Sequence, residues 1–159
     1  MSKLIPKEQF KVVVEHTPLI SIDLITMYKD KVLLGKRVNK PAKDFWFTTG
    51  GIVRKNESFK DAIKRISKNE LGIIIDINKV KFLGVFEHFY EDSIFENIST
   101  HYANHGYLLE LKDELINLPK EQHSEYNWFT IDELLKSNEV HTYVKDYFKN
   151  LELITGENK

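Results

Sequence analysis

The chain has 159 residues, of which 42% are hydrophobic and 30% charged, and 23 basic and 24 acidic side chains give a formal charge of −1. This length fits one domain of ordinary size, so we expect a single domain over residues 1–159. The balanced charge excludes a strongly basic nucleic-acid-binding or membrane-surface protein. The absence of cysteine excludes disulfides and thiolate metal sites. No apolar run approaches the ~18 residues of a membrane span and no secretory signal is visible, so we predict a cytoplasmic protein.

The first part of the chain predicts a helix followed by two strands. A short helix over residues 6–16 would carry Phe10, Val13 and Val14 on one side, and it could form an arm that contacts a partner subunit. Apolar and β-branched residues over 19–37 are interrupted by a "KDK" turn, which is the pattern of strand, turn and strand.

The next stretch, "FWFTTGGIV", is extended and contains paired glycines, and it leads into a helix over residues 58–71. Ser58 and Asp61 are expected to form a capping box at the start of this helix, and Gly72 is expected to end it. The order is therefore strand, glycine loop and helix.

The second half predicts two long strands, "KVKFLGVFEHFYE" and "THYANHGYLLEL", separated by a polar segment. A short strand then runs into a helix capped by Thr130 and Glu133, and "HTYVKDYFKNL" predicts a last helix. Five to seven strands with two to three helices indicate a mixed α/β sandwich. The polar tail at 155–159 is expected to fray.

An acidic residue lies on the apolar side of the predicted helix 58–71. At about 100° per residue, the apolar stripe from Phe59 to Ile66 continues onto Glu70. A buried carboxylate is costly unless a cation or hydrogen-bond donors compensate it, and the helix dipole disfavours a negative charge in the last turn. Three interpretations stay open: this end of the face is exposed, Glu70 pairs with Arg65 or a lysine, or Glu70 binds a metal ion.

Glycines and histidines give weaker signals. "TTGG" could hold a phosphate on backbone N–H groups, but it lacks the P-loop and dinucleotide patterns, so a tight turn is the plainer interpretation. His101 and His105 lie in a predicted strand, where four residues span roughly 13 Å, so they cannot share one ion. His88 could be a half-buried strand residue with a satisfied ring. His123 follows Pro119 in a polar loop and could be solvated or act as a base.

The residues from the paired glycines to the end of the predicted helix resemble the Nudix box. This loop–helix motif belongs to hydrolases that act on nucleoside diphosphates linked to another group. Gly51, Glu57, Arg65 and the "ELG" at 70–72 stand at its spacing. The resemblance implies a Nudix fold, in which a mixed β-sheet sandwich is flanked by helices in an α/β/α arrangement.

Two acids of the standard box are replaced by Ile66 and Asn69. This double loss resembles the GDP-mannose mannosyl hydrolase branch of the family. The likeness continues outside the box through "TPLISID", "LLGKR", "NKPAKDFWF", "EHFYED", "THY" and "LPKEQH".

The resemblance implies one Mg²⁺ per site, with Mn²⁺ as a substitute. Its ligands would be the carboxylate of Glu70, the carbonyl oxygen of Gly50 and the side-chain oxygen of Gln122, all hard oxygen donors. It also implies that water attacks the anomeric carbon of the sugar with inversion, and that His123 is the base. Because diphosphate is a good leaving group, such a site does not need the protonated carboxyl group of a glycosidase.

The resemblance also implies the substrate contacts. Arg37 would bind the diphosphate and stabilise its departure, and Tyr102 would donate a further hydrogen bond. Asp23 and His88 would contact the mannosyl hydroxyls.

One position departs from the family pattern, which has an arginine directly after the paired glycines, where this chain has Ile52. Either Arg54 substitutes for it, or the leaving group is less well stabilised. We expect the second, with slower turnover.

The expected function is therefore Mg²⁺-dependent hydrolysis of GDP-mannose, with GDP-glucose as a second candidate substrate. A conventional Nudix pyrophosphatase, giving GMP and sugar 1-phosphate, and a nucleotide-sugar-binding module without catalysis are the alternatives. The expected partners are a small nucleotide sugar and, by resemblance, a second copy of the chain whose N-terminal segment crosses over. No nucleic acid or membrane partner is expected.

Overall fold

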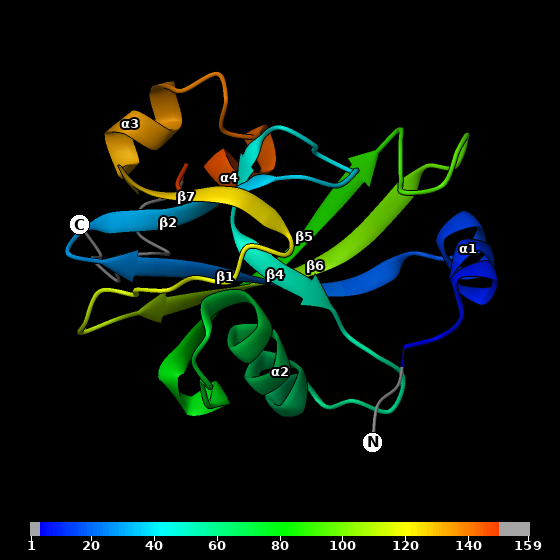
Figure 1. The fold of residues 1–159 in the computed structure, drawn as a ribbon, viewed down its shortest axis with the longest axis horizontal. Helices are drawn as coiled ribbons and strands as arrows, with labels where there is room; N and C mark the ends of the chain where they lie inside the picture. Colours follow the sequence, from blue (N-terminus) through cyan, green and yellow to red (C-terminus); the bar gives the residue numbers. More distant parts are fainter. Residues whose placement is uncertain (1–3, 150–159) are drawn as a thin grey trace.

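The computed structural model describes residues 4–149, and within that range it contains seven β-strands, four α-helices and one 3₁₀-helix (Figure 1). The strand number agrees with the sequence prediction. The four α-helices exceed the predicted two to three, but each lies in a segment where a helix was expected. The predicted frayed tail at 155–159 lies outside the described residues. In chain order the elements are α1 (Lys7–His16), β1 (Leu19–Tyr28), β2 (Lys31–Arg37), β3 (Trp46–Phe47), β4 (Thr49–Ile52), α2 (Phe59–Leu71), η1 (Ile77–Lys79), β5 (Val80–Tyr90), β6 (Thr100–Glu110), β7 (His123–Thr130), α3 (Ile131–Lys136) and α4 (Thr142–Asp146).

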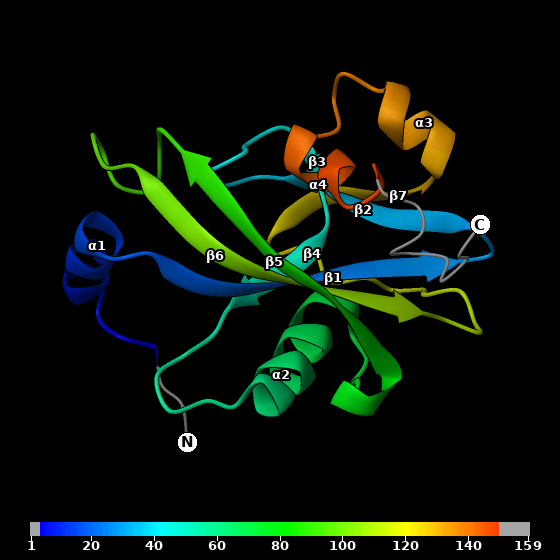
Figure 2. The same ribbon diagram turned by 180° about the vertical axis from the view of Figure 1, so that it is seen from behind.

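The strands form one mixed sheet that divides at β1. The main path has the order β3-β2-β1-β6-β5, while β4 pairs with β1 and β7 pairs with β2. Strand β1 runs parallel to β6 along one edge, and its other edge is shared between β4, which pairs with Ser21 to Leu24, and β2, which pairs with Met27 and Tyr28. Strands β2 and β7 therefore diverge from β5 and β6 beyond the point of division (Figures 1 and 2).

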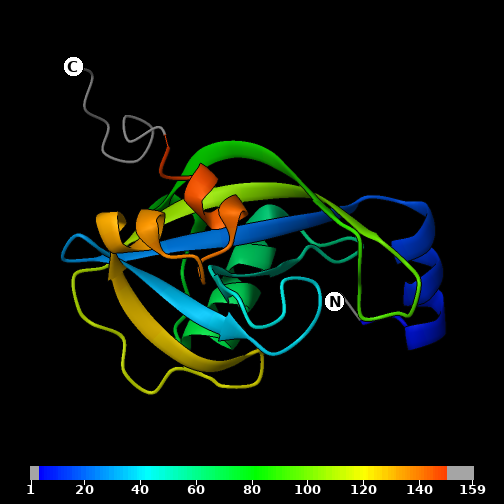
Figure 3. The same cartoon turned by 90° about the horizontal axis from the view of Figure 1, so that it is seen from above.

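Helices cover both sides of the divided sheet, as the sequence predicts. Helix α2 lies on one side and α3 and α4 lie on the other (Figure 2). Helix α1 packs at the end of the sheet where β1 begins, as the view in Figure 3 also shows. Among residues 4–149, none of the helices combines the length and the apolar character needed to cross a membrane.

Two apolar cores lie on the two faces of β1, because successive side chains in a strand point to opposite faces. Ile22 and Leu24 pack with the buried face of α2. Ile25 packs on the other face, with residues of α3 and α4. Asp23 has the parity of Ile25, so the alternation places this carboxylate on the α4 side of the sheet.

Caps fix the ends of the helices. Ser58 accepts a hydrogen bond from the backbone N–H of Asp61 at 3.1 Å, but the Asp61 carboxylate accepts the Ser58 hydroxyl rather than the Ser58 backbone, so the predicted capping box is only half formed. Gly72 ends α2 with φ 76° in the left-handed region, as predicted. The capping box of Thr130 and Glu133 is complete.

Candidate active site

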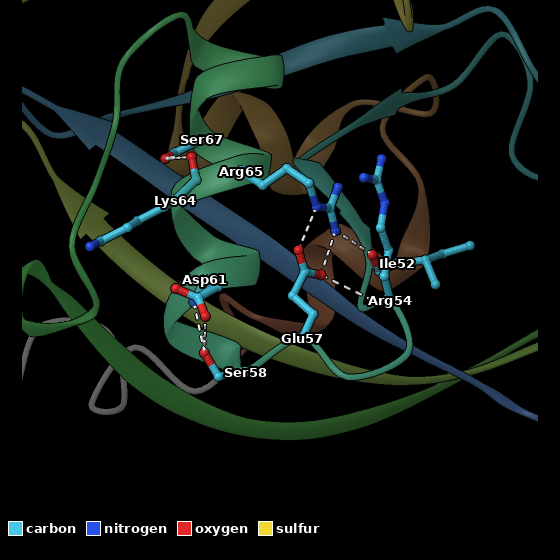
Figure 4. Close-up of polar contacts among 8 residues, drawn as sticks. All are labelled: Ile52, Arg54, Glu57, Ser58, Asp61, Lys64, Arg65 and Ser67. Atoms are coloured by element: carbon cyan, nitrogen blue, oxygen red, sulfur yellow. Dashed lines mark hydrogen bonds and ion pairs between the residues drawn. The ribbon is translucent and has the colours of Figure 1, made fainter. Parts of the chain in front are cut away.

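The loop before α2 is fixed to the helix by an ion pair within the box (Figure 4). Arg65 donates from Nε and Nη2 to the two carboxylate oxygens of Glu57, at 2.7 and 2.9 Å, and Nη2 also donates to the carbonyl oxygen of Ile52 at 2.8 Å. The backbone N–H of Arg54 donates to Glu57 as well. Because Arg65 is committed to Glu57, it is not the partner of Glu70, and of that interpretation only a lysine partner is left.

Glu70 is buried, with 9% of its surface exposed, so the interpretation that this end of the stripe is solvated is wrong. Burial, opposed by the charge of Arg37 and assisted by the charge of Glu121, raises its pKa to about 7. Its closest basic group in the described range is His123, whose Nδ1 lies 3.9 Å from Glu70 Oε2. The metal interpretation is the one of the three that these contacts leave open.

His123 is the first residue of β7, paired with Arg37 of β2, and not part of a loop. It is only 1% exposed, so the expectation of a solvated histidine is wrong. The pairing of β7 with β2 buries the ring against Gly35, where a Cβ would lie 2.5 Å from the imidazole Cγ and Cδ2. Burial, assisted by the charge of Arg37, lowers the pKa of His123 to about 4, so the imidazole is neutral at pH 7.

The neighbours of His123 assign its tautomer. The Tyr126 hydroxyl donates to the carbonyl oxygen of Pro119, so toward His123 Nδ1, 3.3 Å away, it acts as acceptor. This places the ring proton on Nδ1 and leaves Nε2 as the basic nitrogen. Nε2 is buried and has no hydrogen-bond partner in the described structure. For Nε2 to take a proton from water, the ring must turn or the pocket around it must open.

Arg37 stands at the end of β2, where Nε donates to the carbonyl oxygen of Pro41 at 2.8 Å. Its positive charge lowers the pKa of the Asp23 and Glu70 carboxyl groups and also that of the Tyr102 hydroxyl. The guanidinium is therefore within electrostatic reach of the predicted site residues on β1, α2 and β6.

Asp23 is 8% exposed on the α4 side of β1. Its Oδ2 accepts hydrogen bonds from the Tyr147 hydroxyl at 2.7 Å and from Asn104 Nδ2 at 3.0 Å. Burial raises the pKa of Asp23 to about 6, although the hydrogen bonds from Tyr147 and Asn104 and the charge of Arg37 lower it.

The paired glycines lie within strand β4, not in a tight turn or a phosphate loop. Gly50 pairs with Asp23, and a Cβ there would lie 2.3 Å from the carbonyl oxygen of Ile22 and 2.7 Å from Asp23 Oδ1. A Cβ at Gly51 would lie 3.1 Å from Ile66 of α2. The glycines are required because β4 is pressed between the carboxylate on β1 and the box helix.

His88 and Tyr102 face each other across β5 and β6. The His88 ring is 3% exposed and stacks on Tyr143 at 4.2 Å with an interplanar angle of 3°. Burial, and then the charge of His141, lowers the pKa of His88 to about 4. Tyr102 is half-buried, and its ring meets that of Tyr90 edge-on.

His101 and His105 lie in strand β6 and have separate partners, in agreement with the prediction that they do not share an ion. His101 stacks on Phe89, and His105 Nδ1 lies 3.3 Å from the carbonyl oxygen of Ser21.

Gln122, the expected third metal ligand, is exposed, and its Oε1 accepts from Asn39 Nδ2 at 3.5 Å. Its two neighbours affect Glu70 instead: the charge of Glu121 raises the pKa of Glu70, and the His123 ring lies beside the Glu70 carboxylate. Residues 4–149 contain no group of three or more His, Asp or Glu side chains that could hold a metal. A divalent ion here would therefore need backbone, amide or substrate oxygens beside Glu70. A buried carboxylate with a raised pKa and a second carboxylate nearby fit such an ion.

Several residues of the site were not found from the sequence. Asn104 carries a signal, because it is a polar residue at an inward position of an apolar strand. Tyr147 carries none, since it lies 124 residues from Asp23. Tyr126 and Glu121 become significant only when β7 is placed beside β2.

Comparison with known proteins agrees with the fold and the box. The NUDIX domain family model matches residues 17–150, so the chain belongs to the Nudix family of hydrolases. It is 37% identical over 149 residues to the low-salt glycan biosynthesis protein Agl8 of Haloferax volcanii, covering 93% of this chain and 91% of that protein. It is 35% identical over 69 residues to an ADP-ribose pyrophosphatase of Methanocaldococcus jannaschii, covering 43% of this chain and 40% of that one. The crystal structure of a MutT protein from Methanosarcina mazei Go1 is similar in fold, with a TM-score of 0.70, 18% identity and coverage of 89% and 99%.

Proposed function

We propose that the protein hydrolyses GDP-mannose to GDP and free mannose by attack of water at the anomeric carbon with inversion. The observation that carries this proposal is the single carboxylate that the box helix directs to the site. Glu70 faces His123, whereas Ile66, where the standard box has an acid, is 1% exposed in the apolar core, and Asn69 is exposed. The helix therefore supplies one acid to the site and no second carboxylate to activate water at phosphorus.

The proposed cofactor is one Mg²⁺, for which Mn²⁺ can substitute. Glu70 would hold it together with the carbonyl oxygen of Gly50 and the side-chain oxygen of Gln122, once Gln122 is released from Asn39. Bound there, the ion would neutralise negative charge on the diphosphate. A cation also offsets the cost of burying Glu70, which no lysine or arginine in the described range offsets by direct contact.

His123 is the proposed base and Arg37 the proposed partner of the diphosphate. The neutral imidazole takes the proton of the attacking water at Nε2, and the Glu70 carboxylate, 3.9 Å from Nδ1, stabilises the imidazolium that forms. Arg37 balances the charge that develops on the leaving GDP, assisted by Tyr102.

Ile52 bears on the rate of this reaction. Strand β4 ends at Ile52, so Arg54 does not continue the strand on the same face. The Ile52 side chain packs in the apolar cluster of Val14 and Leu19, near Tyr102. Because no cation replaces the expected arginine at this position, slower turnover remains our expectation.

Asp23 and His88 are the proposed contacts of the mannosyl hydroxyls. A nucleotide sugar is supported by the similarity to Agl8, whose name places that protein in glycan biosynthesis. The reaction would take place in the cytoplasm, where nucleotide sugars are used. GDP-glucose is the second substrate to test.

A second candidate reaction is cleavage at phosphorus, favoured by the partial similarity to an ADP-ribose pyrophosphatase. Hydrolysis of GDP-mannose in ¹⁸O-labelled water with Mg²⁺ separates the two. Label in mannose, with GDP as the other product, is the expected result. Label on phosphate, with GMP formed, would overturn the proposal in favour of the second reaction. Tight binding with no product would instead indicate a nucleotide-sugar-binding module.

A further inference from the structure

Two tyrosines at the C-terminal end of the described residues each contact a side chain that is proposed to bind the sugar. Tyr143 lies in α4 and Tyr147 directly follows it, so the two are four residues apart and share one side of the turn. Tyr147 binds Asp23 of β1, and Tyr143 stacks on His88 of β5. These contacts join strands at two places in the sheet to a single turn.

The contact with Asp23 fixes which carboxylate oxygen is free. Oδ2 accepts from both Tyr147 and Asn104, and Asn104 Nδ2 is also in hydrogen-bond contact with the Tyr147 hydroxyl. The amide of Asn104 is itself oriented, because its Oδ1 accepts from Ser21 Oγ at 2.8 Å. Oδ1 of Asp23 makes none of these contacts and lies on the side of Gly50, where a Cβ would be 2.7 Å from it. All members of this network are buried, so the rotamer of Asp23 is determined by its partners.

The contact with His88 fixes the plane of an imidazole. Tyr143 and His88 are parallel within 3° at 4.2 Å between ring centroids. The hydroxyl of Tyr143 donates to the carbonyl oxygen of Phe89 and accepts from its N–H, both at 2.9 Å, which anchors the tyrosine to the strand that carries His88. The imidazole cannot rotate out of this stack without losing its contact area.

We propose that Tyr147 and Tyr143 are positioning residues that orient Asp23 and His88 toward the sugar and thereby set the preference for mannose. This inference rests on the proposed function, because it assumes that the sugar lies at Asp23 and His88. Neither tyrosine touches the substrate. Each acts through the side chain that it holds.

The test compares Tyr147→Phe with Tyr107→Phe. Tyr107 is a buried tyrosine on the α2 side of the sheet, so its variant loses the same hydroxyl without touching Asp23. In Tyr147→Phe we expect kcat/KM for GDP-mannose to fall about tenfold and the preference for GDP-mannose over GDP-glucose to shrink. The inhibition constant of GDP should stay within about twofold, because GDP lacks the sugar. Tyr107→Phe should match the wild type in all three.

Tyr143 is tested by a pair of variants. Tyr143→Phe keeps the ring that stacks on His88 and should retain most of the sugar preference, whereas Tyr143→Leu should lose it. Equal behaviour of the two variants would contradict the role of the stack.

Unchanged kinetics in Tyr147→Phe, or equal weakening for GDP and GDP-mannose, would overturn the inference while the proposed function stands. If the wild type releases no mannose, the proposed function fails. The inference is then tested by measuring the affinities of GDP-mannose and GDP by calorimetry. A Tyr147→Phe variant that weakens GDP-mannose but not GDP would then support it, and equal affinities would reject it.

Discussion

Glu70 is a buried carboxylate whose negative charge is not compensated by a direct ion pair with a lysine or arginine of the described residues. The helical spacing placed the carboxylate on the apolar stripe, and the structure confirms that it is buried. Neither nearby arginine forms an ion pair with Glu70. Arg65 binds Glu57, and Arg37 affects Glu70 only through its charge. The folded apo protein therefore carries a destabilising anion at this site at high pH.

This anion predicts a pH dependence of stability. Burial raises the pKa of Glu70 from 4.5 to about 7, so between these pH values the native state keeps a proton that the unfolded state loses. The contribution of Glu70 to the free energy of unfolding is thus lost as pH rises through this window. In EDTA at pH 8, Glu70→Gln should be more stable than the wild type by about 2–3 kcal/mol. Denaturant unfolding should show this difference vanishing below about pH 4.5.

Mg²⁺ provides the control for the same variant. Addition of Mg²⁺ at pH 8 should raise the melting temperature of the wild type, because the ion binds the native carboxylate, and should leave Glu70→Gln nearly unchanged. Equal shifts in both proteins would show that the ion binds elsewhere.

The base role of His123 is tested by His123→Ala. We expect kcat for GDP release to fall by about 10²–10⁴, the usual contribution of a positioned general base, with Mg²⁺ binding retained. His101→Ala, on an outer position of β6 against Phe89, is the matched control and should stay close to the wild type. A loss of only a few-fold in His123→Ala would remove the residue from this role.

At the scale of elements, the sequence predicted best what local spacing determines. Helix α2, its Ser58 start and its Gly72 end were readable because caps and the 3.6-residue period are local signals. His123 was misplaced because its burial comes from pairing with β2, almost ninety residues earlier in the chain. The glycines of β4 were misread as a turn because their reason is a neighbouring strand and helix, neither of which is visible in "TTGG".

Introducing glutamate at the two positions where the box lacks an acid should change the stability of the protein by different amounts. Ile66 is 1% exposed against Gly51, so Ile66→Glu would bury an unpaired charge and should cost about 3 kcal/mol or more in EDTA. Asn69 is exposed, and Asn69→Glu should change stability by less than about 0.5 kcal/mol. Chemical denaturation measures both. A similar cost at the two positions would mean that α2 is seated differently from the arrangement described.

At the scale of the molecule, the surface retains apolar side chains that the chain does not cover. On α1 only Val14 is buried, whereas Val12 is 55% exposed, and Phe82, Val85 and Phe89 of the edge strand β5 are each more than half exposed. Such a surface could be covered by the second copy of the chain that the resemblance to the family implies.

The predicted dimer can be checked by light scattering. The full chain should have twice the mass of one chain, and a variant without residues 1–16 should be monomeric if α1 crosses to the partner. Its melting temperature should fall only slightly, because both main apolar cores lie outside α1. A deletion variant that remains dimeric would place the interface elsewhere.

The ion pair of Glu57 and Arg65 holds the box in shape but takes no part in the proposed reaction. It locks the loop to the helix without using Glu70, so a substitution of Glu70 leaves this lock in place. Position 66 is different, because Ile66 is buried in the apolar core beside Gly51 and an acid there would lower the stability of the protein. A carboxylate at position 66 would have to overcome this loss of stability before it could serve the site, so a protein with this core is confined to Glu70 as the acid that the helix offers there.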